Sequence, residues 1–226
     1  MQIADRVSLW GGKKSPLPPG ARWVEYLEST STQWIDTGVY YPALANMTFT
    51  IRFRPVNLSV NNNAIFGMNN SRSRGIGLLF TLLQNRGVVA LQGEAGSSVY
   101  TGKTEIKDYE AQLTNAGLTL DGEIWESSRT TISRHGNIFL FAGNSVTSAG
   151  VSTAQPRAVR VYSFSITRGD TGEVLRDFRP IAIGTTGYML DLVSGEHLPY
   201  GNKGTGEFIA GPDAPAMTGG GISAYA

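Results

Sequence analysis

Glu123-Ile124-Trp125-Glu126 is the acidic, aromatic run in the sequence that comes nearest to a pair of catalytic carboxylates. A glycoside hydrolase needs two carboxyl groups held about 5 to 10 Å apart, one acting as acid and the other as nucleophile or base. Side chains three positions apart on a strand point to opposite faces of a sheet, because successive side chains alternate. The spacing of Glu123 and Glu126 therefore does not favour a hydrolase, and we predict no catalytic residue.

Trp125 is a candidate for binding instead of catalysis. An exposed aromatic ring offers a flat apolar face, on which a sugar ring can stack. Trp125 stands beside a predicted hairpin turn, whereas we expect Trp23 and Trp34 to lie in the core. Trp125 is thus the one residue that the sequence predicts to contact a ligand.

Other catalytic and metal-binding patterns are absent from the sequence. His135 and His197 have no partner at a zinc-binding spacing, so we expect both on the surface. The chain has no cysteine, which excludes disulfides and thiolate ligands. A Gly-x-Ser-x-Gly nucleophile motif is missing as well.

Calcium is the one metal that the sequence leaves open. It takes six to eight oxygen ligands from carboxylates, amides and carbonyls. Candidate loop or turn residues are Asp36, Asn69, Asn70, Asp121 and Asn144. No spacing ties them together, and each is typical of a residue that caps its own turn. We therefore predict no cofactor.

The composition favours one large globular domain. The chain has 226 residues, of which 41% are hydrophobic and only 16% charged, and its formal net charge is +1. Such a charge gives no basic field for nucleic acid. No segment approaches the roughly 18 apolar residues of a membrane span. The first twenty residues lack the apolar stretch of a secretory signal, so we expect no export by that route.

Alternating side chains predict strands along most of the chain. Residues 47–54 alternate strictly between apolar and polar types, which places one face in the core. In residues 162–166 the same pattern predicts Tyr162, Phe164 and Ile166 on one face. Asp121-Gly122 suits the type I′ turn of a hairpin over residues 118–125. Other strands are expected near residue 34 and at 65–68, 76–82, 88–91 and 138–142. No segment has convincing helical spacing, so a two-sheet sandwich or a barrel is expected.

Two stretches resemble a known family. VEYLEST at residues 24–30, followed by QWIDTG at 33–38, resembles the opening phrase of LamG-like, concanavalin A-like jelly-roll domains from tailed-phage structural proteins and gut-bacterial surface proteins. Residues 161–212, with RDFRP, GYMLDL and GTGEFIAGP, resemble the closing pattern of these domains. Residues 197–200 depart from it, so that edge is expected to be reshaped.

The resemblance implies an all-β, two-sheet antiparallel jelly-roll sandwich with an extended N-terminal arm. We expect an arm at residues 1–21, the LamG-like domain at 22–213 and a flexible tail at 214–226. The arm is either a strap on its own domain or an anchor for a partner. Within the closing pattern we expect an ion pair between Arg176 and Asp177, and Pro180 is expected to end its strand because it lacks a ladder donor.

The resemblance also implies a binding or structural role. The Glu-x-Asp-x-x-Glu string of β-glucanases on this fold is absent. We predict a non-enzymatic phage virion protein, a capsid decoration, head fibre or tail-associated component, which contacts other virion proteins through its arm and forms homo-oligomers. The alternative is a carbohydrate-binding lectin or adhesin of a phage tail tip or bacterial cell surface that binds host-surface glycans. An unrecognised glycan hydrolase is a third possibility.

Overall fold

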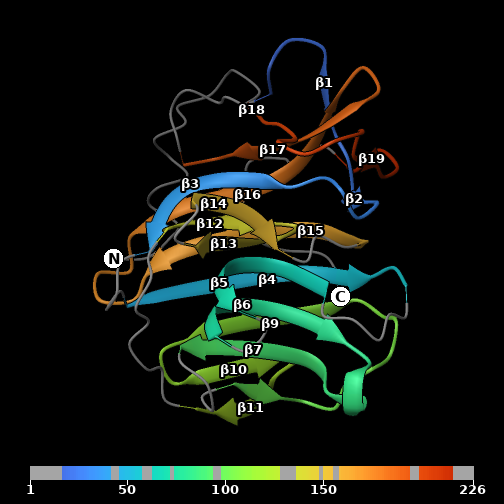
Figure 1. The fold of residues 1–226 in the computed structure, drawn as a ribbon. Helices are drawn as coiled ribbons and strands as arrows, with labels where there is room; N and C mark the ends of the chain where they lie inside the picture. Colours follow the sequence, from blue (N-terminus) through green and yellow to red (C-terminus); the bar gives the residue numbers. More distant parts are fainter. Residues whose placement is uncertain are drawn as a thin grey trace.

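The computed structural model describes residues 17–41, 46–57, 63–71, 74–93, 98–127, 136–147, 150–154, 158–193 and 199–215. Over these residues the fold is two β-sheets packed face to face, as the sequence predicts (Figure 1). The one helical segment in the described part is a short 3₁₀ turn, η1, at Leu83–Asn85. None of the described helices is long and apolar enough to span a membrane.

The larger sheet has eleven strands, all of which pair in antiparallel fashion. Its main path runs β11 (Glu123–Glu126), β10 (Gly117–Leu120), β9 (Tyr109–Thr114), β4 (Met47–Pro55), β15 (Val159–Arg168), β16 (Val174–Ile183), β17 (Thr186–Asp191) and β18 (Pro199–Tyr200). Three short strands join it from the side: β1 (Ala21–Trp23) pairs with β16, and β2 (Leu27–Ser29) lies between β15 and β19 (Ile209–Ala210). The two ends of the chain's described part therefore meet in this sheet.

The smaller sheet has eight strands. Its main path runs β14 (Gly150–Ala154), β13 (Gly143–Thr147), β5 (Asn63–Ser71), β6 (Arg74–Thr81), β7 (Gly87–Gly93) and β8 (Val99–Tyr100). β12 (Gly136–Leu140) pairs with both β5 and β3 (Ile35–Tyr41). The β13–β5 pair is parallel and the other pairs are antiparallel.

The core lies between the sheets and is rich in phenylalanine. Phe49 and Phe164 come from neighbouring strands of the larger sheet, and Phe66 from the smaller sheet packs against both, with ring centroids 5.2 and 4.9 Å away. All three side chains are buried. Offset and tilted ring contacts at these separations stabilise a core beyond the area that they bury. β4 follows the alternation that its sequence predicts, with every second side chain buried.

The predicted hairpin is present. Leu120 pairs with Glu123, and the two residues between them have positive φ angles, 50° at Asp121 and 81° at Gly122. Type I′ turns need positive φ at both central positions, which asparagine, aspartate and glycine adopt most readily. This local signal was sufficient to predict β10, the turn and β11.

Pro180 does not end β16, contrary to the prediction, since the strand continues to Ile183. Pro180 lies opposite Met189 of β17, while its carbonyl accepts a hydrogen bond of 3.2 Å from the N–H of Val24. The nitrogen and carbonyl of one strand residue point to the same side of the strand. The nitrogen of Pro180, which carries no hydrogen, therefore faces the β1–β2 side. The pairing of β16 with β17 consequently loses no hydrogen bond.

The described end of the predicted arm is folded onto its own domain. Leu17 and Ala21 pack with Trp23 against Ile181 and Leu190, on the outer face of the larger sheet. Trp23 is buried as predicted, although in this small outer cluster and not in the core between the sheets. Residues 1–16, which would decide whether the arm is also an anchor, lie outside the described residues.

The two ends of the domain also pair with each other. The N–H of Glu25 donates to the carbonyl of Pro212 at 3.0 Å, and that of Ala214 donates to the carbonyl of Trp23 at 3.1 Å. Arg22 forms an ion pair with Asp213. The predicted boundary near residue 213 thus falls within a paired segment.

Candidate functional site

Trp125 lies on the edge strand β11 with its ring turned toward the core. The residue opposite it is the buried Leu118, and the half-buried ring packs against the core's margin. Lys103 Nζ lies 5.9 Å from the ring centroid and also pairs with Glu123 at 2.9 Å. Ile124, which precedes Trp125 on β11, points to the opposite face of the sheet and is 70% exposed. Ligand contact by Trp125 stays a prediction.

The acidic pair of β11 is arranged as its spacing predicts. Glu123 and Glu126 are both exposed, and strand alternation directs them to opposite faces of the sheet. Glu123 is engaged by Lys103. The two carboxylates do not converge on one point.

Two of the predicted calcium candidates, Asp36 and Asp121, accept hydrogen bonds from other residues of the protein. Asp36 accepts from the N–H of Gly38 at 2.9 Å and from the side-chain amide of Asn137 at 3.0 Å. Asp121 accepts from the N–H of Glu110 at 2.9 Å. Asp36 thus lies within β3 and not in a loop or turn, and the Asp121 contact reaches across to β9, so the Asp36–Gly38 bond alone is the local cap that the sequence predicts.

Of the other three candidates, Asn144 is the one whose side chain the structure describes. Asn144 is buried, and its amide donates to the carbonyl of Asn137 at 2.8 Å. Among the residues that the structure describes, no group of three or more His, Cys, Asp or Glu side chains lies together to hold a metal. Asn69 and Asn70 belong to β5, but their side chains, like His135 and His197, lie outside the described part.

A different set of side chains gathers on the outer face of the larger sheet, the face turned away from the core. We call it the tyrosine–arginine cluster, and its members are Tyr26, Glu28, Arg52, Arg54, Asp108, Arg160 and Tyr162. They come from β2 and the residue before it, from β4 and β15, which lie beside β2 in the sheet, and from the segment that leads into β9.

A β-bulge places Tyr162 in this cluster. Val161 pairs with Phe53 of β4, but the next pair is Ser163 with Arg52, so Tyr162 is an extra residue. Such a bulge shifts the side chains that follow it and redirects the extra one. Tyr162 consequently lies on the outer face, and the prediction that it shares a face with Phe164 and Ile166 is wrong.

Asp108 joins Tyr162 to two arginines. The Tyr162 hydroxyl donates to Oδ1 of Asp108 at 2.9 Å. Arg52 donates to Oδ2 at 3.2 Å, and Arg54 lies 3.7 Å from Oδ1. The guanidinium of Arg52 also stacks 4.9 Å from the centroid of the Tyr162 ring. The carboxylate thus orders a phenol and two guanidinium groups at once.

The other half of the cluster repeats this pattern. Arg160 lies 4.5 Å from the centroid of the Tyr26 ring and donates from Nε to Glu28 at 2.6 Å. The rings of Tyr26 and Tyr162 meet edge to face, 5.7 Å apart. Gly211 lies so close to Tyr26 that an added Cβ would come within 2.9 Å of the ring. A glycine is therefore required there for Tyr26 to keep its place.

The cluster is only partly open to solvent, and this changes its ionisation. Burial, followed by the hydrogen bond to Asp108 and its charge, raises the pKa of Tyr162 to about 12. The hydrogen bond to Glu28 raises the pKa of Arg160. Tyr162 therefore keeps its proton at physiological pH and donates it to Asp108 in a hydrogen bond.

Small polar side chains continue this face beyond the cluster. Thr50 of β4 lies opposite Gln112 of β9 and Ser165 of β15, and Thr48 lies opposite Thr167. All five are at least partly exposed. The face therefore offers hydroxyl and amide groups in rows, with the tyrosine–arginine cluster at one end.

This arrangement can bind a polar, hydroxyl-rich ligand. Carboxylates and carbonyl oxygens accept from hydroxyl groups, and guanidinium N–H groups donate in a fixed planar fork. The stacking of Arg52 and Arg160 on tyrosine rings restricts their rotation, so they lose less freedom when a ligand binds. Groups held in this way favour recognition of a ligand of defined geometry.

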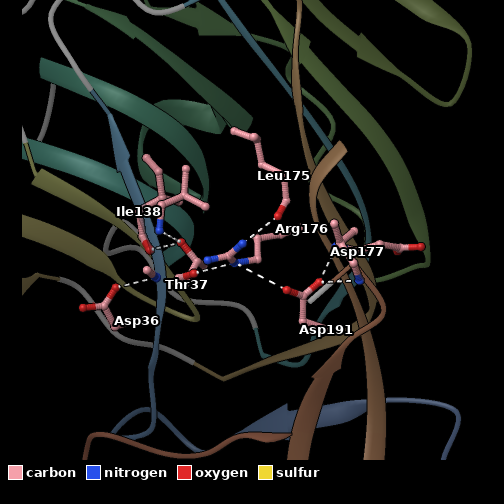
Figure 2. Close-up of polar contacts among 10 residues, drawn as sticks. Asp36, Thr37, Ile138, Leu175, Arg176, Asp177 and Asp191 are labelled. Atoms are coloured by element: carbon pink, nitrogen blue, oxygen red, sulfur yellow. Dashed lines mark hydrogen bonds and ion pairs between the residues drawn. The ribbon is translucent and has the colours of Figure 1, made fainter. Parts of the chain in front are cut away.

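A second polar group joins the two sheets at their rim, and Figure 2 shows it with Arg176 at its centre. Nε of Arg176 donates to the carbonyl of Thr37 on β3 at 3.1 Å and lies 3.5 Å from Oδ2 of Asp191 on β17. Oδ1 of Asp191 accepts from the N–H groups of Asp177 and Val193. These contacts are internal, and they identify the group as a structural clamp.

The clamp corrects the predicted ion pair between Arg176 and Asp177. Arg176 pairs with Asp191, while Asp177 pairs with Arg179 at 3.0 Å. Adjacent strand residues point to opposite faces, so Arg176 reaches between the sheets and Asp177 points outward. Burial raises the pKa of Asp177, as does the charge of Asp191, although Arg179 acts in the opposite direction.

Sequence reasoning did not find the tyrosine–arginine cluster. Its members are spread from residue 26 to residue 162, and only the sheet pairing of β2 with β15 and of β15 with β4 unites them. One signal was available in β4, where Arg52 and Arg54 occupy the polar positions of the clearest alternating strand. Two arginines on one face of a central strand indicate that carboxylates or aromatic rings lie nearby.

The architecture defines this chain as a two-sheet sandwich that fits the jelly-roll lectin fold. No protein-family model matches the sequence, and no curated protein sequence matches it either.

Among solved structures, the chain is similar in fold to a protein of Bacteroides ovatus named "putative carbohydrate binding protein", with a TM-score of 0.52. The similarity covers 80% of this chain and 59% of that protein, at 12% sequence identity. This chain thus spans less than two thirds of the length of that protein. At such low identity the likeness shows the fold alone.

Proposed function

We propose that this protein is a non-catalytic carbohydrate-binding domain whose ligand contacts the tyrosine–arginine cluster. The observation that carries the proposal is the bulge at Tyr162. An extra residue in a central strand interrupts the ladder, and here it turns a tyrosine out of the core to meet Asp108 and Arg52. Bulges are often retained where they direct a side chain to a functional site.

Two further observations support a glycan as the ligand. The fold is similar to that of a protein whose name refers to carbohydrate binding. The outer face of the larger sheet also presents threonine, serine and glutamine side chains beside the cluster, which are suited to hydroxyl groups. A flat polar face on a sheet can accommodate several sugar units of a polymer.

A binding role without catalysis agrees with the arrangement of the carboxylates. Glu28 and Asp108 are each tied to an arginine, at 2.6 and 3.2 Å. Each carboxylate accepts a hydrogen bond from an arginine and has further lone pairs for another donor. These two groups are therefore suited to accepting hydrogen bonds from a ligand.

The experiment is a glycan array followed by calorimetry on the polymer that binds. We expect Tyr162→Ala to weaken binding by about tenfold or more, as loss of a central aromatic contact does. The matched control is Tyr100→Ala, because Tyr100 is accessible to solvent and likewise has an arginine, Arg86, 4.7 Å from its ring centroid. Equal affinity of the two variants would contradict the cluster as the site.

Trp125→Ala tests the site that the sequence predicts. If the ligand contacts the cluster on the outer face, Trp125→Ala should bind as tightly as the unchanged protein, because the Trp125 ring turns toward the core. Loss of binding in Trp125→Ala, with Tyr162→Ala unaffected, would move the site to the sheet edge.

The virion role stays a prediction. Residues 1–16, through which the arm would contact other virion proteins, lie outside the described residues, and a location in a virion or on a bacterial surface rests on the sequence resemblance alone. Deletion of residues 1–20 followed by mass spectrometry of purified particles tests it. Full incorporation of the shortened protein would contradict anchoring by the arm.

A further inference from the structure

We infer that the glycan bound at the tyrosine–arginine cluster is electrically neutral, and not a uronic-acid or sulfated polymer. This inference rests on the proposed function and adds the chemical class of the ligand. It follows from the balance of charges on the outer face of the larger sheet.

The cluster's positive charges are matched by carboxylates on the same face. Arg52, Arg54 and Arg160 contribute three guanidinium groups, and Glu28 and Asp108 contribute two carboxylates. A third carboxylate comes from Glu110 of β9, which lies directly opposite Arg52 in the sheet. Directly opposed side chains lie on one face, about 5 Å apart at Cβ, so Glu110 belongs to the same electrostatic environment.

Charged groups around the cluster are balanced as well. Lys107, next to Asp108 in the chain, pairs with Asp121 at 2.7 Å. Farther along the outer face, Asp177 pairs with Arg179 at 3.0 Å. Neither pair adds a net charge to the face. The balance therefore holds at the cluster and at these two pairs, and a ligand that contacts the cluster meets matched charges of both signs.

An acidic ligand would bind poorly at such a site. Its carboxylate or sulfate must lose water, and the guanidinium groups that would replace that water are already paired with Glu28 and Asp108. It would also approach three carboxylates. A neutral sugar avoids both costs, because its hydroxyl groups donate to the carboxylates and accept from the guanidinium edges while the ion pairs stay intact.

The test compares neutral polymers (dextran, mannan and galactan) with acidic ones (polygalacturonate, alginate and chondroitin sulfate), by affinity electrophoresis and calorimetry. We expect binding only among the neutral polymers. We also expect Kd to change by less than about twofold between roughly 0.02 M and 0.3 M salt, because no net charge is neutralised.

A charge variant makes the inference sharper. Glu110→Gln removes the carboxylate that balances the three arginines against Glu28 and Asp108, so it should create measurable, salt-sensitive binding to polygalacturonate. Glu110 is exposed, and the substitution keeps its size. The matched control is Glu126→Gln, which makes the same change of protein charge on the edge strand β11 and should leave polygalacturonate unbound.

The outcomes separate the two proposals. Binding of an acidic polymer by the unchanged protein, weakened by salt and by Tyr162→Ala, would overturn the neutral-ligand inference and keep the proposed function. Binding of none of the polymers would overturn both. Binding of a neutral polymer that Tyr162→Ala leaves unchanged would overturn the cluster as the binding site and, with it, the inference drawn from the cluster's charges.

Discussion

The hydroxyl of Tyr162 donates a hydrogen bond of 2.9 Å to Asp108, a residue fifty-four positions earlier in the chain. Tyr162 reaches this carboxylate only because β15 contains one residue more than β4 requires at this point. The contact therefore links an irregularity of the sheet to the composition of the outer face.

Deletion of Tyr162 should leave a folded protein that has lost its ligand. Val161 already pairs with Phe53 and Ser163 with Arg52, so removal of the residue between them restores a regular ladder without shifting any other pair. We expect an unchanged β-type circular-dichroism spectrum, a single cooperative transition in urea, and glycan binding weakened about tenfold or more. Loss of cooperative unfolding would show instead that the bulge is needed for folding.

The phenol of Tyr162 should ionise near pH 12, whereas an unperturbed tyrosine ionises near pH 10. Because the folded-state pKa is raised, its contribution to stability is complete below about pH 10 and is lost as the pH rises through about 12. Absorbance titration at 295 nm, with Tyr162→Phe subtracted, measures this group among the nine tyrosines. A difference curve centred near pH 10 would contradict the burial of this hydroxyl.

Asp191→Ala should destabilise the fold strongly. The change leaves Arg176 without its carboxylate and removes the acceptor of two N–H groups, those of Asp177 and Val193. Loss of one partner from a buried ion pair costs about 3 kcal/mol or more in the free energy of unfolding. Urea unfolding measures it. The control is Asp213→Ala, whose partner Arg22 is exposed, with an expected loss of about 1 kcal/mol or less.

Asp177→Asn should flatten the dependence of stability on pH. The folded-state pKa of Asp177 is raised, mainly by burial, so its contribution is complete below the ordinary value of about 3.9 and is lost as the pH rises through the raised value. Urea midpoints across this range should fall less in the variant than in the unchanged protein. The pKa of Asp170 is shifted in the opposite direction, because its hydrogen bond with Arg168 lowers it. The contribution of Asp170 to stability is therefore lost as the pH falls. An equal pH dependence of the unchanged protein and Asp177→Asn would contradict the prediction.

The sequence predicts features that depend on neighbouring residues. Strict alternation in β4 correctly assigned its buried face, and Asp121-Gly122 correctly located the hairpin turn. In both cases the physical cause is local, since side-chain direction follows strand geometry and positive φ follows residue type. The two-sheet fold follows from the accumulation of such signals along the chain.

Features that depend on a partner strand were not predictable in this way. Nothing in residues 159–168 reveals the extra residue at Tyr162, because a bulge exists only relative to the strand beside it. The same reason applies to Pro180, which is tolerated because its nitrogen faces the β1–β2 side. Arg176 pairs with Asp191, not with its neighbour, for a related reason: adjacent residues occupy opposite faces.

The pairing of residues 22–25 with 212–214 makes this domain suited to circular permutation. Arg22 contacts Asp213, so a short linker between these two segments would close the backbone into a ring, and the exposed turn at Asp121-Gly122 offers a place to open it. The same adjacency has a practical result for display of the domain. A carrier attached before Arg22 or after Asp213 would stand at one pole, close to Tyr26, whereas a permuted chain would carry it at the opposite, hairpin end.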